Sequence, residues 1–455
     1  MRRKKSYSGI IFMIGFMAII GGVIFLYNAK MFERDLPVIT VDNDGYWNLK
    51  SPLEINIEDT TGIRSYKVSL QSGDETFVLA SEQFIQPEMD VSIEAKAPKR
   101  AYRLKSSEVV ITIEATDGSK WNFLGGNTVS TKMTLQIDKK RPFLTTVTNS
   151  YAIMRGGSAL VIFKANDDNL DSLQIETNFG KVFHPQPFYK EGYYASLVAW
   201  PVTERSFRAT IVAKDLAGNV AKTSVPFRIR DKSYRVSKIK LSDRFLDGKI
   251  AQLAEEFEET DGVEDRIEKF KIINETVREK NEILIHDITS KVSDQEIKTF
   301  NIKPFYPLKN AQKVASFGDH RHYYYKGEKV SESYHLGLDL ASVKMGKIMT
   351  KNPAVVVFSE ENGLYGNMLA LHHGMGLYTI YGHCSSHNVQ AGDQVGSNKH
   401  IANTGMSGYA MGDHLHFGVL VQGIEVRPEE WMDKQWIRLN ISEVMSNAKK
   451  IIKRQ

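Results

Sequence analysis

The sequence predicts a mainly β protein. It is expected to contain an N-terminal transmembrane helix, two immunoglobulin-like β-sandwich modules, a helical connector and a small antiparallel β domain. Three observations support this prediction: an uncharged apolar run at the start, short alternating segments separated by polar turns, and histidines concentrated near the end. With 455 residues, 42% of them hydrophobic and 25% charged, the chain has a globular composition and is long enough for about three domains.

The net charge bears on nucleic-acid binding, and the cysteine content bears on disulfide bonding. The net charge of +5 is small for this length, and the sequence contains no dense basic patch with interleaved aromatic residues. We therefore expect no nucleic-acid partner. The single cysteine, Cys384, excludes an intramolecular disulfide.

Residues 1–33 are expected to form a basic cytoplasmic N-terminus and a membrane anchor. Four positive charges at residues 2–5 precede residues 9–29, which carry no charge. About 20 apolar residues span a hydrocarbon core of roughly 30 Å, and a positive flank favours the cytoplasmic side. The alternative is a cleavable signal peptide, but FLYNAKM is a poor cleavage site. Either way, the remaining chain is exported. An uncleaved anchor makes a single-pass protein of the cytoplasmic (inner) membrane with a periplasmic or extracellular catalytic domain.

Residues 34–139 and 140–236 are each predicted to form an immunoglobulin-like β module. Runs such as LEINIEDTTGIRSYKVSL and RSFRATIVAKDLAGNV alternate apolar and polar residues between turns. INIEDTTGI and IVAKDLAGN share a strand-then-turn pattern, which indicates weak repeats of one unit. The acidic residues of these turns suggest calcium as one interpretation. Asp is common in turns because its side chain bonds to the backbone, so the turn interpretation is favoured.

Residues 237–302 are predicted to be a helical connector, because Glu, Lys, Leu and Ile recur there at helical spacing. The connector and the β modules are also the regions where a protein partner could bind and hold the chain latent. Residues 434–455 form a basic C-terminal tail. ISEVMSNAKKIIKRQ predicts a short amphipathic helix, which we expect to be solvated rather than bound to an anionic membrane.

Residues 303–433 are predicted to form the domain that contains the functional site. Of the 12 histidines, 10 lie at or beyond His320, which indicates a function based on imidazole. In the segment YHLGLDLAS, strand alternation places His335, Gly337 and Asp339 on one face and the leucines on the other. Because Gly337 has no side chain, the two flanking groups can reach one point. An imidazole and a carboxylate around one centre indicate zinc-type ligation.

Two further segments supply histidines to the same region. In LYTIYGHCSS, alternation predicts one face for Thr379, Tyr381 and His383. In GDHLHFGV, it predicts one face for His414 and His416. Four histidines and one aspartate on strand-like segments, with glycine-rich connections between them, fit a catalytic zinc site with an open position for water.

The ordered segments SFGDHR, HLGLDLAS, NGLYGNMLALHHGMGLYTIYGHCSS, VQAGDQVGSNKHIANTGMSG and GDHLHF resemble those of the LytM/lysostaphin-type zinc endopeptidases, the M23 metallopeptidases. The resemblance covers residues 316–427. It implies one zinc ion per chain and peptidoglycan stem peptides or cross-bridges as substrate. It also implies that His335, Asp339 and His416 are the zinc ligands, and that His383 and His414 are catalytic residues that do not bind the metal.

The resemblance leaves a second function open. Some members are non-enzymatic regulators that activate other cell-wall hydrolases, and these typically lack zinc ligands. All five positions are present here, which favours an enzyme. The tyrosine-rich segment HRHYYYKGEKVSESYH is predicted to be a loop that shapes or covers the substrate groove. Four other histidines are expected to line the groove or face solvent: His320, His322, His387 and His400.

Overall fold

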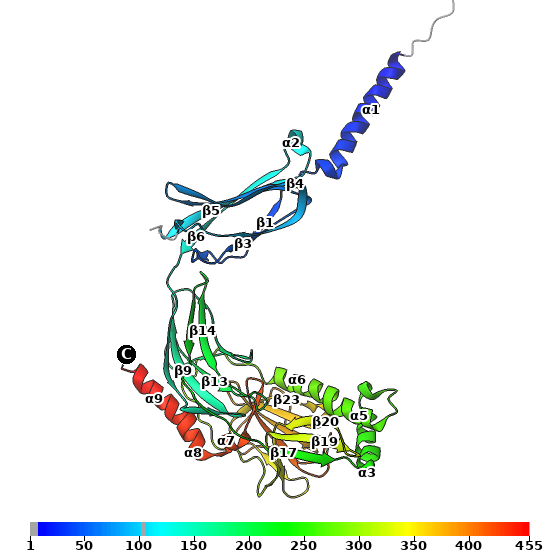
Figure 1. Cartoon of the computed structure of the whole chain (residues 1–455), viewed down its shortest axis with the longest axis vertical. Coiled ribbons are helices and arrows are strands. Elements are labelled where there is room, and N and C mark those ends of the chain that lie inside the picture. The colour runs from blue at the N-terminus through cyan, green and yellow to red at the C-terminus, as the bar shows by residue number, and fades with distance from the viewer. Residues whose placement is uncertain (1–7, 102–105, 455) are drawn as a thin grey trace, which may run out of the picture. The chain divides into compact units, whose positions relative to one another are not determined.

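The computed structural model describes residues 8–101 and 106–454 (Figure 1). The basic residues 2–5, on which the expected orientation of the anchor depends, lie outside the described residues. Helix α1 (Ser8–Asn28) is, among the described residues, the one helix long and apolar enough to cross a membrane. The chain forms two compact units: residues 1–142 with 167–171 and 214–220, and the remaining residues. The mainly β fold with an N-terminal apolar helix is confirmed.

The first β module is a six-stranded sheet in the order β1-β3-β5-β6-β2, with β4 paired to β3. Its hydrogen bonding is continuous, because β3 pairs with β1 before Ile63 and with β5 from Ile63 onward. Apolar residues from both halves of β3, such as Ile57 and Val68, share one core. Its elements are β1 (Val38–Val41), β2 (Tyr46–Trp47), β3 (Leu53–Ser72), β4 (Glu75–Ala95), β5 (Glu108–Asp117), α2 (Trp121–Leu124) and β6 (Thr128–Ile137).

The second β module consists of two four-stranded sheets, β11-β10-β14-β15 and β12-β13-β9-β7. Acidic turns in both modules bond to their own backbone: Asp59 Oδ1 accepts from the N–H of Thr61 and Asp215 Oδ1 from the N–H of Asn219. These bonds support the turn interpretation. The strands are β7 (Phe143–Asn149), β9 (Ser158–Asn166), β10 (Leu170–Thr177), β11 (Val182–Phe183), β12 (Gln186–Pro187), β13 (Tyr193–Ala199), β14 (Ala209–Asp215) and β15 (Val220–Ser224), with β8 (Ala152–Met154) paired to β16 (Arg228–Arg230).

The segment predicted to be a helical connector begins with a strand, β17 (Val236–Lys240), which pairs in parallel with β19 (Asp319–Tyr325). The helices that follow are packed, because Phe270 and Ile273 are buried in one cluster with Tyr323 of β19. The Phe270 and Tyr323 rings meet edge to face at 5.1 Å. The segment is therefore a wall of the C-terminal domain rather than a free connector. Its helices are α3 (Asp243–Phe245), α4 (Ala251–Ala254), α5 (Arg266–Ile272) and α6 (Arg278–Ile288).

The tyrosine-rich segment is not a loop. It forms the antiparallel hairpin of β19 (Asp319–Tyr325) and β20 (Glu328–His335), which with β17 makes a three-stranded sheet. The main sheet has the order β18-β21-β29-β25-β24-β23-β27, with β30 paired to β29. Its strands are β18 (Gln312–Ala315), β21 (Leu338–Ala341), β23 (Ala354–Glu361), β24 (Asn367–His372), β25 (Leu377–Cys384), β27 (Gln394–Val395), β29 (Leu415–Val421) and β30 (Ile424–Val426), beside a smaller sheet of β22 (Lys347–Met349), β28 (His400–Asn403) and β26 (Ser386–His387).

The second β module and the C-terminal sheets share one hydrophobic core. The N–H of Ser158 on β9 donates to Glu430 Oε2 (3.0 Å), and Trp431 Nε1–H donates to Ser158 Oγ (3.1 Å). The C-terminal tail is also packed: α9 lies against β7 and β9 with Ala448 fully buried. The expectation of a solvated tail is wrong, because the second module covers the apolar face of this helix. The helices are α7 (Pro428–Met432), α8 (Lys434–Ile437) and α9 (Glu443–Ile452).

Candidate metal centre

Three side chains from three strands converge on one point. His335 ends β20, Asp339 lies on β21, and His416 lies directly opposite Asp339 on β29. His335 Nε2 and His416 Nδ1 are each 3.0 Å from Asp339 Oδ1, and the two ring nitrogens are 3.2 Å apart. Each side chain is at most 15% exposed. The three residues that the family resemblance implies as zinc ligands are therefore brought together.

The chain path to this point differs from the predicted single strand. β20 and β21 belong to different sheets, and the backbone crosses between them at residues 336–337. A Cβ added at Gly337 would lie 2.5 Å from His416 Nε2 and 2.9 Å from the Phe417 carbonyl oxygen. Glycine is therefore needed at position 337, because the backbone passes directly against the His416 ring.

Backbone contacts fix the orientation of the first imidazole. Nδ1 of His335 is 2.9 Å from the Ser316 carbonyl, which only accepts hydrogen bonds, so Nδ1 carries the proton. In the neutral ring, Nε2 is then a bare acceptor that faces Asp339 and His416. Burial by itself raises the pKa of Asp339, but the imidazoles of His335 and His416, each 3.0 Å from Oδ1, outweigh this and hold that pKa well below its usual range. The carboxylate is therefore charged, and the set presents electron pairs to one point.

His383 reaches the cavity by a route that strand alternation does not predict. Gly382 pairs with His416 and Tyr381 with Phe417, so regular alternation would turn His383 to the Phe417 side. The backbone of His383 has φ 63°, in the left-handed region. The shared face predicted for Tyr381 and His383 is therefore wrong: Tyr381 is in the core, and His383 lines the cavity.

His383 and His414 form a pair beside the three convergent residues. Their ring centroids are 4.8 Å apart, and His414 Nε2 is 3.7 Å from Asp339 Oδ1. In both rings Nδ1 is 2.8 Å from a backbone carbonyl, of Ser407 for His383 and of Gly412 for His414. Each Nδ1 therefore donates, and each neutral ring keeps a bare Nε2. Burial, together with the neighbouring histidines, lowers the pKa of His383 to about 3.

All five residues line one cavity of about 440 Å³, which residues 239–242 and Phe245 also line. Sequence reasoning missed Arg321 on β19, which lines the same cavity with Nη2 4.0 Å from Asp339 Oδ2. It also missed Tyr365, whose buried ring lies edge to face with His416 at 5.3 Å. Arg321 lies two residues beyond Asp319, which is the direct strand partner of His335. This position could have located Arg321 only if the hairpin had been predicted, because the pairing exists only within it.

The partly buried imidazole of His373 is expected to make the free energy of unfolding fall on acidification. Its Nδ1 is 3.1 Å from the Pro353 carbonyl and its Nε2 2.8 Å from Thr379 Oγ1, and burial lowers its pKa to about 4. The unfolded chain takes up this proton near pH 6.5 and the folded protein only near pH 4. Stability is therefore complete above about pH 6.5 and falls below it by up to about 1.4 kcal/mol per pH unit.

Urea unfolding at neutral pH and at about pH 5 checks this expectation. His373→Gln should show a shallower loss of stability with pH than the wild type. The matched control His400→Gln replaces a histidine of β28 and should keep the wild-type slope. Equal slopes in all three proteins would contradict the prediction.

Comparison with known proteins places this site in a family. The sequence model of a family described as "Peptidase family M23" matches residues 333–428. This range includes the three convergent residues and the His383–His414 pair. Stage II sporulation protein Q of Bacillus subtilis (strain 168) is 33% identical over 103 residues, which cover 22% of this chain and 36% of that protein. The DD-carboxypeptidase/endopeptidase Mpg of Neisseria meningitidis serogroup B is 31% identical over 94 residues, 21% of this chain and 22% of that protein.

The matches are therefore local, since they span about a third and about a fifth of these relatives' lengths. Among solved structures, a putative peptidase M23 from Pseudomonas aeruginosa is similar over 61% of this chain and 94% of that chain, with 16% identity and a TM-score of 0.32. The C-terminal part of this chain is a peptidase family M23 domain.

Proposed function

We propose that this chain is a zinc-dependent endopeptidase that hydrolyses peptide cross-links of peptidoglycan. The observation that carries the proposal is the convergence of His335 Nε2, Asp339 Oδ1 and His416 Nδ1 in a cavity that also holds two further histidines. The M23 match and the name of the neisserial relative support this class of substrate.

The donor set fits zinc in type and in spacing. Two imidazole nitrogens and one carboxylate oxygen are common zinc ligands, and three protein ligands with one open position are typical of catalytic sites. With zinc–nitrogen distances of 2.0–2.1 Å, tetrahedral ligand atoms lie roughly 3.3 Å apart. The distances of 3.0–3.2 Å among the three atoms are close to this value. His335, Asp339 and His416 would hold the ion, which when bound supplies a Lewis acid and a water of lowered pKa.

The remaining pair, His383 and His414, is placed for proton transfer. Each neutral ring has a bare Nε2, because its Nδ1–H is bound to a backbone carbonyl. Such a nitrogen can accept a proton from the attacking water and return it to the leaving amine. His414 Nε2 lies 3.7 Å from Asp339 Oδ1. Acid–base assistance of this kind contributes about 10²–10⁴-fold in rate.

We also propose that α1 remains as an anchor, with the peptidase part outside the cytoplasm where peptidoglycan lies. The length and apolar composition of α1 support a membrane span, and the basic residues 2–5 support a cytoplasmic N-terminus. Protease added to intact spheroplasts should degrade the C-terminal domain. Protection of that domain would contradict this orientation.

The alternative function is a non-enzymatic regulator of other cell-wall hydrolases. It is motivated by the similarity to Stage II sporulation protein Q, whose name states no hydrolase activity. The presence of all five cavity residues favours hydrolysis.

Removing the metal tests the function directly. The purified full chain in detergent is incubated with peptidoglycan, and the released muropeptides are identified by mass spectrometry. We expect cleaved cross-links, loss of cleavage with a chelator and recovery with added zinc, and the product masses identify the bond. Bound zinc without cleavage, with identical behaviour in wild type and His414→Ala, would instead support the regulator.

A further inference from the structure

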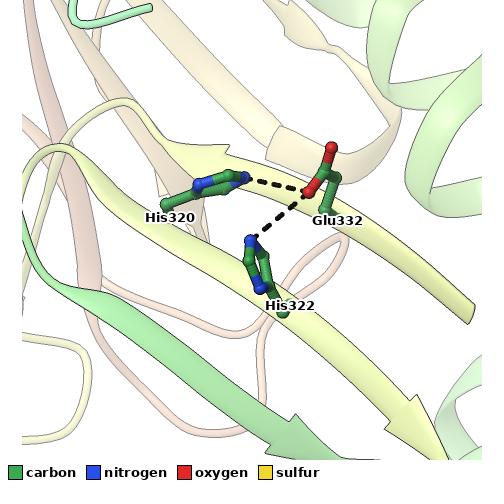
Figure 2. Close-up of side chains that lie close together, drawn as sticks. All are labelled: His320, His322 and Glu332. Atoms are coloured by element: carbon green, nitrogen blue, oxygen red, sulfur yellow. Dashed lines mark hydrogen bonds and ion pairs between the residues drawn. The ribbon is translucent and has the colours of Figure 1, made fainter. Parts of the chain in front are cut away.

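A second group of metal-binding side chains lies on the hairpin β19–β20. His320 and His322 are two residues apart on β19 and point to one side, and Glu332 on β20 is the direct partner of His322. Figure 2 shows both rings turned toward this carboxylate. His320 Nε2 is 3.1 Å and His322 Nε2 is 3.3 Å from Glu332 Oε2, and the three ligand atoms all lie within 4.8 Å of one another.

We propose that His320, His322 and Glu332 form a second site for a divalent transition metal, with zinc as the ion it would take. Two imidazoles and one carboxylate match the ligand preference of zinc. On β19, Arg321 between the two histidines and Tyr323 after them line the cavity described above. Since neighbouring strand residues face opposite sides, the second site lies on the other face of the hairpin and shares no ligand with the first.

The side chains are already held in place. The Tyr334 ring stacks on His320 at 4.2 Å with 9° between the ring planes, and the two imidazoles meet edge to face at 4.3 Å. His322 Nε2 is shielded from solvent and makes no hydrogen bond of good geometry. A ligand nitrogen is therefore available for a metal.

Lys329 is the competitor for this site. Its ammonium is 2.5 Å from the same Glu332 oxygen, and its side chain is 41% exposed. A bound cation would displace this ammonium, and the exposed side chain can swing into solvent. The alternative explanation of the cluster is a structural ion pair between Lys329 and Glu332, beside which two histidines lie without binding a metal. The two explanations differ in one consequence: removing Lys329 strengthens metal binding only if the metal site exists.

A metal at this position would tie β19 to β20 close to the first site. β20 ends at His335, and β19 supplies Arg321 to the cavity. The second ion would therefore support one wall of the cavity without touching the substrate.

Zinc stoichiometry tests the proposal independently of any peptidase activity. The full chain in detergent is stripped with a chelator, dialysed against zinc and analysed by atomic emission. We expect two zinc ions per wild-type chain, and one in His322→Gln and in Glu332→Gln. Two should remain in the matched control Glu328→Gln, which alters a carboxylate of the same strand outside the cluster. Lys329→Met should bind the second ion with a several-fold lower Kd.

Further variants keep the outcome interpretable. His416→Ala should keep the ion at the second site, and Glu332→Gln should keep the ion at the first site. The retained ion shows in each case that the variant is folded. One ion per chain in the wild type that persists in His322→Gln and Glu332→Gln would overturn the proposal. So would a second ion that these substitutions leave unchanged. A single ion that is lost in Glu332→Gln but retained in His416→Ala would support the second site and count against the first.

Discussion

Replacing His416 by alanine is expected to remove both the bound zinc and the cleavage of peptidoglycan. Its Nδ1 is one of three convergent ligand atoms, and two protein ligands are too few for a catalytic zinc site. His414→Ala should keep the zinc and lower turnover by about 10²–10⁴-fold, because its ring lies beside the set and is held by the Gly412 carbonyl. Zinc content per chain and the rate of muropeptide release measure the two effects.

The two substitutions delete the same side chain two residues apart on one segment, so each controls for the other. A third variant, His400→Ala, removes a histidine that is not among the cavity residues and should change neither measurement. Equal loss of zinc in His414→Ala and His416→Ala would show that the division of roles is wrong.

Gly337→Ala is expected to damage the same centre through packing alone. The new methyl group would lie 2.5 Å from His416 Nε2 and 2.9 Å from the backbone oxygen of Phe417. The backbone oxygen cannot rotate away, so the imidazole ring must shift. Overpacking of this kind costs about 1–3 kcal/mol, which lowers Tm by a few degrees. Zinc affinity should fall by about 10–100-fold, the range found when groups that orient a metal ligand are changed.

Gly396→Ala is the matched control, because no atom lies within 4 Å of its added Cβ and its φ is not positive. It should leave Tm and zinc affinity near their wild-type values. Calorimetry and zinc titration of both variants check the prediction. A Gly337→Ala protein that binds zinc as tightly as the Gly396→Ala protein would contradict it.

Strand alternation predicted much of the centre. Leu338 and Leu340 are 2% and 5% exposed while Asp339 faces the centre, and Leu415 and Phe417 are fully buried on either side of His416. Alternation of this kind is a local property of extended backbone, so the sequence contains it. Alternation placed Gly337 between His335 and Asp339, but it did not reveal the contact with the His416 ring that requires a glycine there.

The placement of His383 could not be predicted in this way. A non-glycine residue with φ 63° pays a backbone cost of about 1–3 kcal/mol, and distant contacts such as the Ser407 carbonyl must hold it there. The hairpin was missed for a different reason. β19 and β20 present polar side chains on both faces, with Arg321 toward the cavity and His320 away from it, so they lack the apolar alternation that marks a half-buried strand.

The core shared by the second β module and the C-terminal sheets has a consequence for how this protein can be divided. Ser158 bonds to Glu430 and Trp431 across that core, so a peptidase excised at residue 303 would expose a large apolar face. The parts of the second module that share this core are therefore expected to melt together with the C-terminal sheets in one cooperative transition. A chimera made with a relative should remain soluble only if the crossover lies before Phe143, so that module and peptidase are inherited together.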